Sequence, residues 1–168
     1  MSLHRNCCAV MEMPYKLMIT AAVLAMVLPV MLESVQLVSQ NQAERELEDQ
    51  CQFLADTAVV LYRCGLDSEK TIELSLPDST VLVSAGAKLD GSSRAKAVSI
   101  QFKITGGELH RIVVKSVNNY ISLSSEQQGE FKITQGGTHL LQLKKCEIDL
   151  DLNYDGITPD YYIMITEL

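Results

Sequence analysis

The order of apolar and polar positions divides the chain into three stretches with different periods. Residues 17–32 (LMITAAVLAMVLPVML) hold no charged side chain, and Thr20 supplies their one side-chain hydroxyl. Together with the mostly apolar residues just before it, this run approaches the roughly 20 residues with which a helix crosses a bilayer. We therefore expect a membrane-spanning helix over 13–32, preceded by a short cytoplasmic segment over 1–12.

The second stretch, from Glu33 onward, is polar and free of glycine and proline until Gly65. Within it, apolar residues recur at spacings of 4, 3, 4 and 3, which mark one face of a helix. Gly65 is placed to cap the C-terminal end. The sequence thus predicts one long helix over 13–64, membrane-spanning over 13–32 and amphipathic over 33–64. Its apolar stripe should pack against the domain that follows, or alternatively against a helix of another subunit. The stripe comprises Leu47, Cys51, Leu54, Ala58 and Leu61.

After Gly65 the period changes to two. Ile100, Phe102 and Ile104 alternate with polar residues, which is typical of a half-buried strand. Glycine, proline and asparagine turns separate about eight such segments, among them 138–144 and 146–152, and no helix is expected between them. This pattern favours an antiparallel sandwich or barrel. We expect an all-β head over 65–168, an antiparallel β-sandwich of about 7–8 strands on the long N-terminal α-helix.

Charge adds an orientation to this picture. Arg5 and Lys16 against Glu12 give residues 1–32 a charge of +1. Because the whole chain has a net charge of −7, residues 33–168 carry −8. Basic residues near a membrane helix stay on the cytoplasmic side, so the head should be extracytoplasmic. An acidic head offers no attraction to nucleic acid. No A-x-A-like cleavage site follows the apolar run, which favours a retained anchor over a removable secretory signal.

Three of the five cysteines, Cys51, Cys64 and Cys146, fall in the extracytoplasmic part, where disulfides persist. Cys51 and Cys64 would lie about 20 Å apart on one helix, too far to bridge. If a disulfide forms, it should join Cys146 to one of these two. Cys7 and Cys8 precede the apolar run and belong to the cytoplasmic side.

The most distinctive polar motif lies near the C-terminus. Asp151, Asn153 and Asp155 occupy alternate positions before Gly156, as in the first half of a calcium-binding loop. Asp160 falls two residues short of the position at which a bidentate acid closes such a loop. The alternative is an acidic strand, whose outer face holds these carboxylates, followed by a turn.

Catalytic motifs are not recognisable. The chain has no G-x-S-x-G and no C-x-x-C, and its two Gly-Gly pairs precede predicted strands rather than helices. His110 and His139 lie in different predicted strands and should be surface or cross-strand polar residues. We expect no enzymatic activity and no cofactor.

The N-terminal residues resemble those of type IV pilin-like proteins, particularly the archaeal ones. In that family a short leader is cut on the cytoplasmic face, a Glu stands fifth after the cut, and a Pro often stands seventeen residues later. Glu12 and Pro29 have that spacing here. The resemblance implies cleavage between Cys7 and Cys8, and roles for Glu12 and Pro29 in assembly.

The resemblance implies a function as well. The chain would be a structural subunit, major or minor, of an archaeal type IV pilus-like surface filament. It would assemble through its apolar helix, with the head exposed for adhesion. Its partners would be membrane lipid before assembly, copies of itself or related pilins, and the pilin signal peptidase. The alternative is a single-pass, membrane-anchored β-sandwich accessory protein of the cell envelope, similar to archaellum stator proteins or to proteins that bind the surface layer.

Overall fold

The computed structural model describes residues 6–87, 89, 94–117, 119–126, 129–148 and 160–168, with the backbone alone for residues 6–13, 94 and 95. Its contacts divide the chain into two compact units, Met1–Asn41 and Gln42–Leu168. One helix, α1 (Asn6–Tyr62), runs through the first unit and supplies the first element of the second. The second unit, which also contains the strands, is the head.

A long N-terminal helix is confirmed, but α1 begins at Asn6, within the segment 1–12 that was expected to precede it, and ends at Tyr62. It includes Pro14 and Pro29, and Thr20 Oγ1 donates a hydrogen bond to the carbonyl one turn before it. The helix ends in a tighter turn, where the amides of Arg63 and Cys64 donate to the carbonyls three residues before them. From this point the chain enters the first strand of the head.

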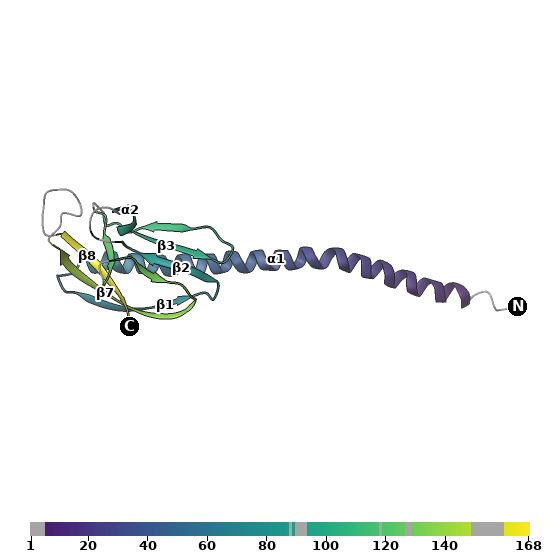
Figure 1. Ribbon diagram of the computed structural model, residues 1–168. Helices are drawn as coiled ribbons and strands as arrows, with labels where there is room; N and C mark the ends of the chain where they lie inside the picture. The colour runs from purple at the N-terminus through teal and green to yellow at the C-terminus, as the bar shows by residue number, and fades with distance from the viewer. Residues whose placement is uncertain (1–5, 88, 90–93, 118, 127–128, 149–159) are drawn as a thin grey trace. The chain divides into compact units, whose positions relative to one another are not determined.

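The strands of the head form two four-stranded sheets in the described part of the chain. Sheet A has the order β1 (Glu69–Leu76), β7 (Gly137–Ile148), β8 (Asp160–Glu167), β5 (Ser122–Ser125). Sheet B has the order β4 (His110–Val113), β3 (Ser99–Ile104), β2 (Thr80–Ala85), β6 (Phe131–Ile133). The architecture is therefore α+β and sandwich-like (Figure 1).

The expectation of a purely antiparallel sandwich needs correction, because sheet A is mixed. β5 runs parallel to β8, with Ser122 opposite Tyr162 and Ser125 opposite Ile165. Hairpin turns force neighbouring strands to be antiparallel. β5 instead reaches sheet A after the chain has passed through β4 of sheet B, so no hairpin sets its direction.

Two local expectations were also wrong. A short helix, α2 (Arg94–Ala97), lies between β2 and β3. The segments 138–144 and 146–152 do not form separate strands, because one 12-residue strand, β7, runs through the first and into the second as far as Ile148. In β7 the side chains of Leu141, Leu143 and Lys145 are buried, so Cys146 and Ile148 belong to the opposite face.

The core of the head is built from the second half of α1 and from both sheets. The apolar stripe of α1 is buried in one cluster with residues of both sheets, which confirms that the stripe packs against its own head. Figure 1 shows this half of α1 running beside strands of both sheets. The fully buried side chains include Leu47, Leu54, Leu74, Phe102, Leu123, Leu141 and Ile163.

Candidate functional site

The N-terminal part of α1 is the strongest candidate for a functional segment. Every described side chain from Pro14 to Asn41 is exposed, and Leu17, Met26 and Leu32 keep 69%, 76% and 62% of their surface. The helix is long and apolar enough to cross a membrane, a property that anchors and N-terminal signal sequences share. Apolar surface of this extent requires a cover of lipid or protein.

The residues assigned to processing and assembly lie on this same helix. Cys7, Cys8 and Glu12 belong to the helical backbone of α1, and their side chains are outside the described part. Pro29 lies inside the helix and is exposed. Because proline has no amide hydrogen, the carbonyl of Ala25 lacks its helical donor there. Cleavage between Cys7 and Cys8, and assembly roles for Glu12 and Pro29, stay predictions.

The three described cysteines are free thiols in different environments. Cys51 is fully buried in the core, where burial, reinforced by the charge of Glu48, raises its pKa to about 12. Burial also raises the pKa of Cys146. Cys64 is exposed at the end of α1, and its Sγ donates to the carbonyl of Val60 at 3.4 Å. The structure does not pair Cys146 with either of the other two.

The calcium hypothesis falls largely outside the described residues, which exclude Asp151, Asn153 and Asp155. Asp160, the fourth candidate, begins β8, and its side chain is buried. Among described residues no group of three or more His, Cys, Asp or Glu side chains could hold a metal ion.

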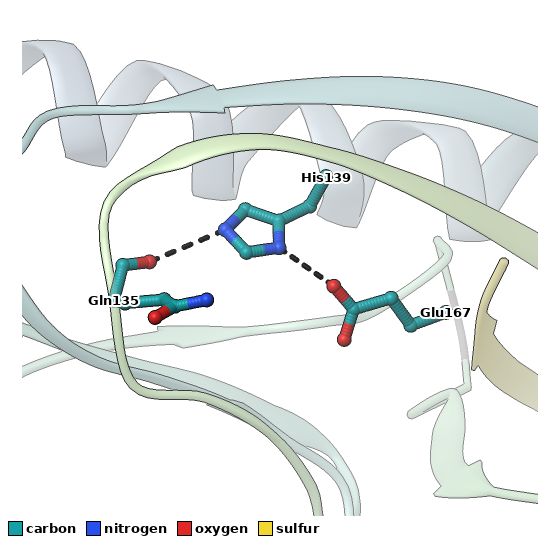
Figure 2. A network of polar contacts seen from close by, with 3 residues as sticks. All are labelled: Gln135, His139 and Glu167. Carbon is teal, nitrogen blue, oxygen red and sulfur yellow. Dashed lines mark hydrogen bonds and ion pairs between the residues drawn. The ribbon is translucent and has the colours of Figure 1, made fainter.

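His139 joins β7 to the end of β8 (Figure 2). Its ring is buried, with Nδ1 2.7 Å from Glu167 Oε1 and Nε2 3.2 Å from the carbonyl oxygen of Gln135. Both partners are acceptors, so a doubly protonated ring satisfies both contacts, whereas a neutral ring donates to one of them. The residue after Gln135, Gly136, passes close to the backbone of Pro77. A Cβ added at Gly136 would lie 2.2 Å from the carbonyl oxygen of Pro77, so only glycine fits at this turn.

His110 links sheet B to α1. Its Nε2 contacts Glu44 Oε1, and its ring stacks on Phe102 with centroids 5.3 Å apart. His139 and His110 are thus both paired with carboxylates, across strands for His139 and between strand and helix for His110. Sequence reasoning anticipated polar residues at these positions, but it could not identify their partners.

Lys145 was missed by sequence reasoning. Its side chain is buried, and Nζ donates to the carbonyls of Tyr62 at 2.7 Å and Cys64 at 2.9 Å. The ammonium group also lies over the rings of Tyr62 and Tyr161, 5.1 and 4.6 Å from their centroids. A cation at this place complements the negative end of the helix dipole. The one available signal in the sequence was strand alternation, because Lys145 lies two residues after Leu143 and four after Leu141, on the same face of the strand.

Comparison with known proteins adds no family to this description. No protein-family model matches the chain, and neither the curated proteins nor the solved structures contain a match. The described clusters join elements of the head, whereas the apolar side chains of α1 from Leu17 to Leu32 are exposed in the part of the chain that the structure describes. A functional assignment must therefore start from that segment.

Proposed function

We propose that this chain is a structural subunit of an archaeal type IV pilus-like surface filament. The observation that carries the proposal is the exposure of the whole apolar run 17–32 on a helix that is also part of the head's core. The Glu12 and Pro29 spacing supports the same function. The chain would insert into the membrane first, be cut by the pilin signal peptidase between Cys7 and Cys8, and then pack against copies of itself or related pilins.

The apolar run and part of the head's core belong to one continuous helix, α1. Leu47, Leu54 and Leu61 are buried in the head, and the same helix carries the exposed run 17–32. Because the two are joined by one continuous segment of chain, whatever covers the apolar run also tethers the head. In a filament, packing of the runs would place the heads at the surface, where they could meet a target for adhesion.

A single-pass anchored accessory protein of the envelope is the second candidate. It is favoured by the fact that lipid alone could cover every exposed residue between Leu17 and Leu32. The two candidates differ in what happens when the lipid is removed. A polymerising subunit should form filaments through the run 17–32, whereas an accessory protein should stay in discrete particles.

The experiment compares the native chain with a Leu24→Ala, Leu28→Ala variant, whose segment stays apolar but loses packing volume. Membrane extracts are exchanged out of detergent and examined by sedimentation and electron microscopy. We expect filaments from the native chain, fewer or shorter filaments from the variant, and equal membrane insertion of both. Monodisperse particles from the native chain would contradict the filament proposal and favour the accessory protein.

A further inference from the structure

The outer face of sheet B is basic although the chain as a whole is acidic. Ile100, Phe102 and Ile104 point into the core, so Lys103 lies on the outer face of β3, and the same alternation places Arg111 and Lys132 there on β4 and β6. Lys96 of α2 is exposed. It is close enough to Glu130, the residue just before β6, for its charge to help lower the pKa of that carboxyl. We call Lys96, Lys103, Arg111 and Lys132 the basic face.

Strand register arranges part of this face in a row. Gln101 lies opposite Arg111 and Ser84, and Ser84 lies opposite Lys132, so the row crosses all four strands of sheet B. With strands about 4.8 Å apart, it is about 14 Å long. Ser84 in this row is buried, so the exposed cations of the row are Arg111 and Lys132 at its two ends. Glu130 lies over the Lys132 end: its carboxylate accepts hydrogen bonds from Ser84 and from Lys132, with Oε2 3.0 Å from Lys132 Nζ. Four cations and this acid give +3 in a region, residues 33–168, that carries −8, so the remainder of that region carries −11.

The exposed side of α1 within the head presents the complementary charge. Its outward residues recur at spacings of 3, 4, 3 and 4, and we call them the acidic stripe: Glu46, Asp49, Phe53, Asp56 and Val60. Glu46 and Asp56 accept hydrogen bonds from the side-chain amides of Gln42 and Gln52, and among described residues none of the three carboxylates is in an ion pair. From Glu46 to Asp56 the stripe rises about 15 Å.

We propose that the basic face of one copy docks on the acidic stripe of a second copy. The charges are opposite and the two lengths match, at about 14 and 15 Å. Phe53 and Val60, 46% and 57% exposed, supply apolar contacts in the stripe, and Val113, 42% exposed, supplies one beside Arg111. Two different surfaces of one chain that bind each other make a head-to-tail contact, which propagates into a ring or an open filament. The inference rests on the proposed function, for which it specifies how the head of one copy contacts the head of the next.

The test uses the full-length chain and a zero-length carbodiimide, which joins a lysine to a carboxylate only when the two are in contact. Isotopically labelled and unlabelled copies are mixed before assembly, so that mass spectrometry separates links between copies from links within one. We expect labelled-to-unlabelled links from Lys96, Lys103 or Lys132 to Glu46, Asp49 or Asp56. Their yield should fall as salt is raised, because exposed charges are screened.

Charge reversal provides the specificity control. Lys103→Glu with Lys132→Glu should reduce the yield of these links at least tenfold, and so should Asp49→Lys with Asp56→Lys. A chain that carries all four changes should regain links, because each surface again meets its opposite. Lys70→Glu, an exposed reversal on β1 of the other sheet, is the matched control and should leave the yield unchanged. If a reversal unfolds the head, Lys103→Gln with Lys132→Gln gives the same comparison with a smaller loss.

Two results would overturn the inference. The first is filaments without these links, which would leave the proposed function intact and place the head contacts elsewhere. The second is links whose yield is insensitive to the reversals, or lost equally with Lys70→Glu. Sedimentation reports separately on the proposed function, since native chains that stay as discrete particles contradict the filament whatever links they form.

Discussion

At the scale of single residues, two buried ionisable side chains of the head, Lys145 and His139, each have partners of the right kind. Lys145 meets two carbonyl oxygens and two tyrosine rings, and His139 meets a carboxylate and a carbonyl. A buried group without such partners would cost several kcal/mol of stability. These contacts also connect segments distant in sequence, since Lys145 holds the end of α1 against β7.

Removing the Lys145 ammonium should weaken this connection. Lys145→Met keeps the apolar stem but leaves the carbonyls of Tyr62 and Cys64 without this donor, and we expect a loss of about 2 kcal/mol in the free energy of unfolding. Lys144→Met is the matched control, because Lys144 makes a surface ion pair with Asp67 and should matter little. Chemical denaturation of both variants, followed by circular dichroism, measures the difference. Equal effects would show that the Lys145 contacts add nothing.

Glu130 predicts a dependence on pH. Burial opposes its ionisation, but hydrogen bonds from Lys132 and Ser84 and the charges of Lys132 and Lys96 outweigh burial and lower its pKa below the ordinary value of 4.5. A pKa lowered by folding contributes stability above the unfolded-state value, and the contribution is lost as the pH falls through the folded-state value. The stability advantage of the native chain over Glu130→Gln should therefore shrink between about pH 5 and pH 3. A constant difference over this range would contradict the assignment.

At the scale of elements, α1 depends on the head for its second half. Leu54 is fully buried among residues of both sheets, so Leu54→Ala should cost about 2–5 kcal/mol in the free energy of unfolding of the head. Phe53→Ala removes a larger side chain from the exposed side of the same turn and should change the stability of the single subunit far less. Thermal unfolding of the two variants under dispersed conditions tests the packing of the stripe. Similar losses would mean that α1 does not sit in the core as described.

The sequence predicted these elements where a periodic pattern dominates. The stripe of α1 and the alternation of Ile100, Phe102 and Ile104 identified a helix and a strand because their apolar sides face one core. The pattern failed in β7, where Ile148 suggested that even-numbered positions point inward. Lys145 is odd-numbered and buried, and sequence reasoning assigns a lysine to solvent because its partners, Tyr62 and Tyr161, lie far away in the chain.

Relations between distant segments were the other limit. The parallel pairing of β5 with β8 joins Ser122 to Tyr162, and no local signal gives the direction of a strand that arrives from the other sheet. The candidate segment could be predicted from the sequence, because the apolar composition of residues 17–32 is sufficient to identify it. The basic face could not be predicted in this way, since only the strand register places Arg111 and Lys132 in one row across the sheet.

At the scale of the whole molecule, the chain separates two kinds of surface. The described side chains of Met1–Asn41 are exposed and largely apolar, whereas Gln42–Leu168 has a closed core and a strongly divided surface charge. The apolar run needs a cover, and the divided charge of the head would permit contacts between the heads of two copies. Assembly of copies of the chain, as proposed above, would supply the cover and use these contacts.

The most direct test of that proposal is the intact mass and N-terminal sequence of the native protein extracted from membranes. Processing by a pilin peptidase predicts a chain that begins at Cys8, with Glu12 as its fifth residue. A chain beginning at Met1 or Ser2 would contradict the pilin assignment of Glu12 and leave an anchored head. A chain beginning after Leu32 would contradict assembly through the apolar helix altogether.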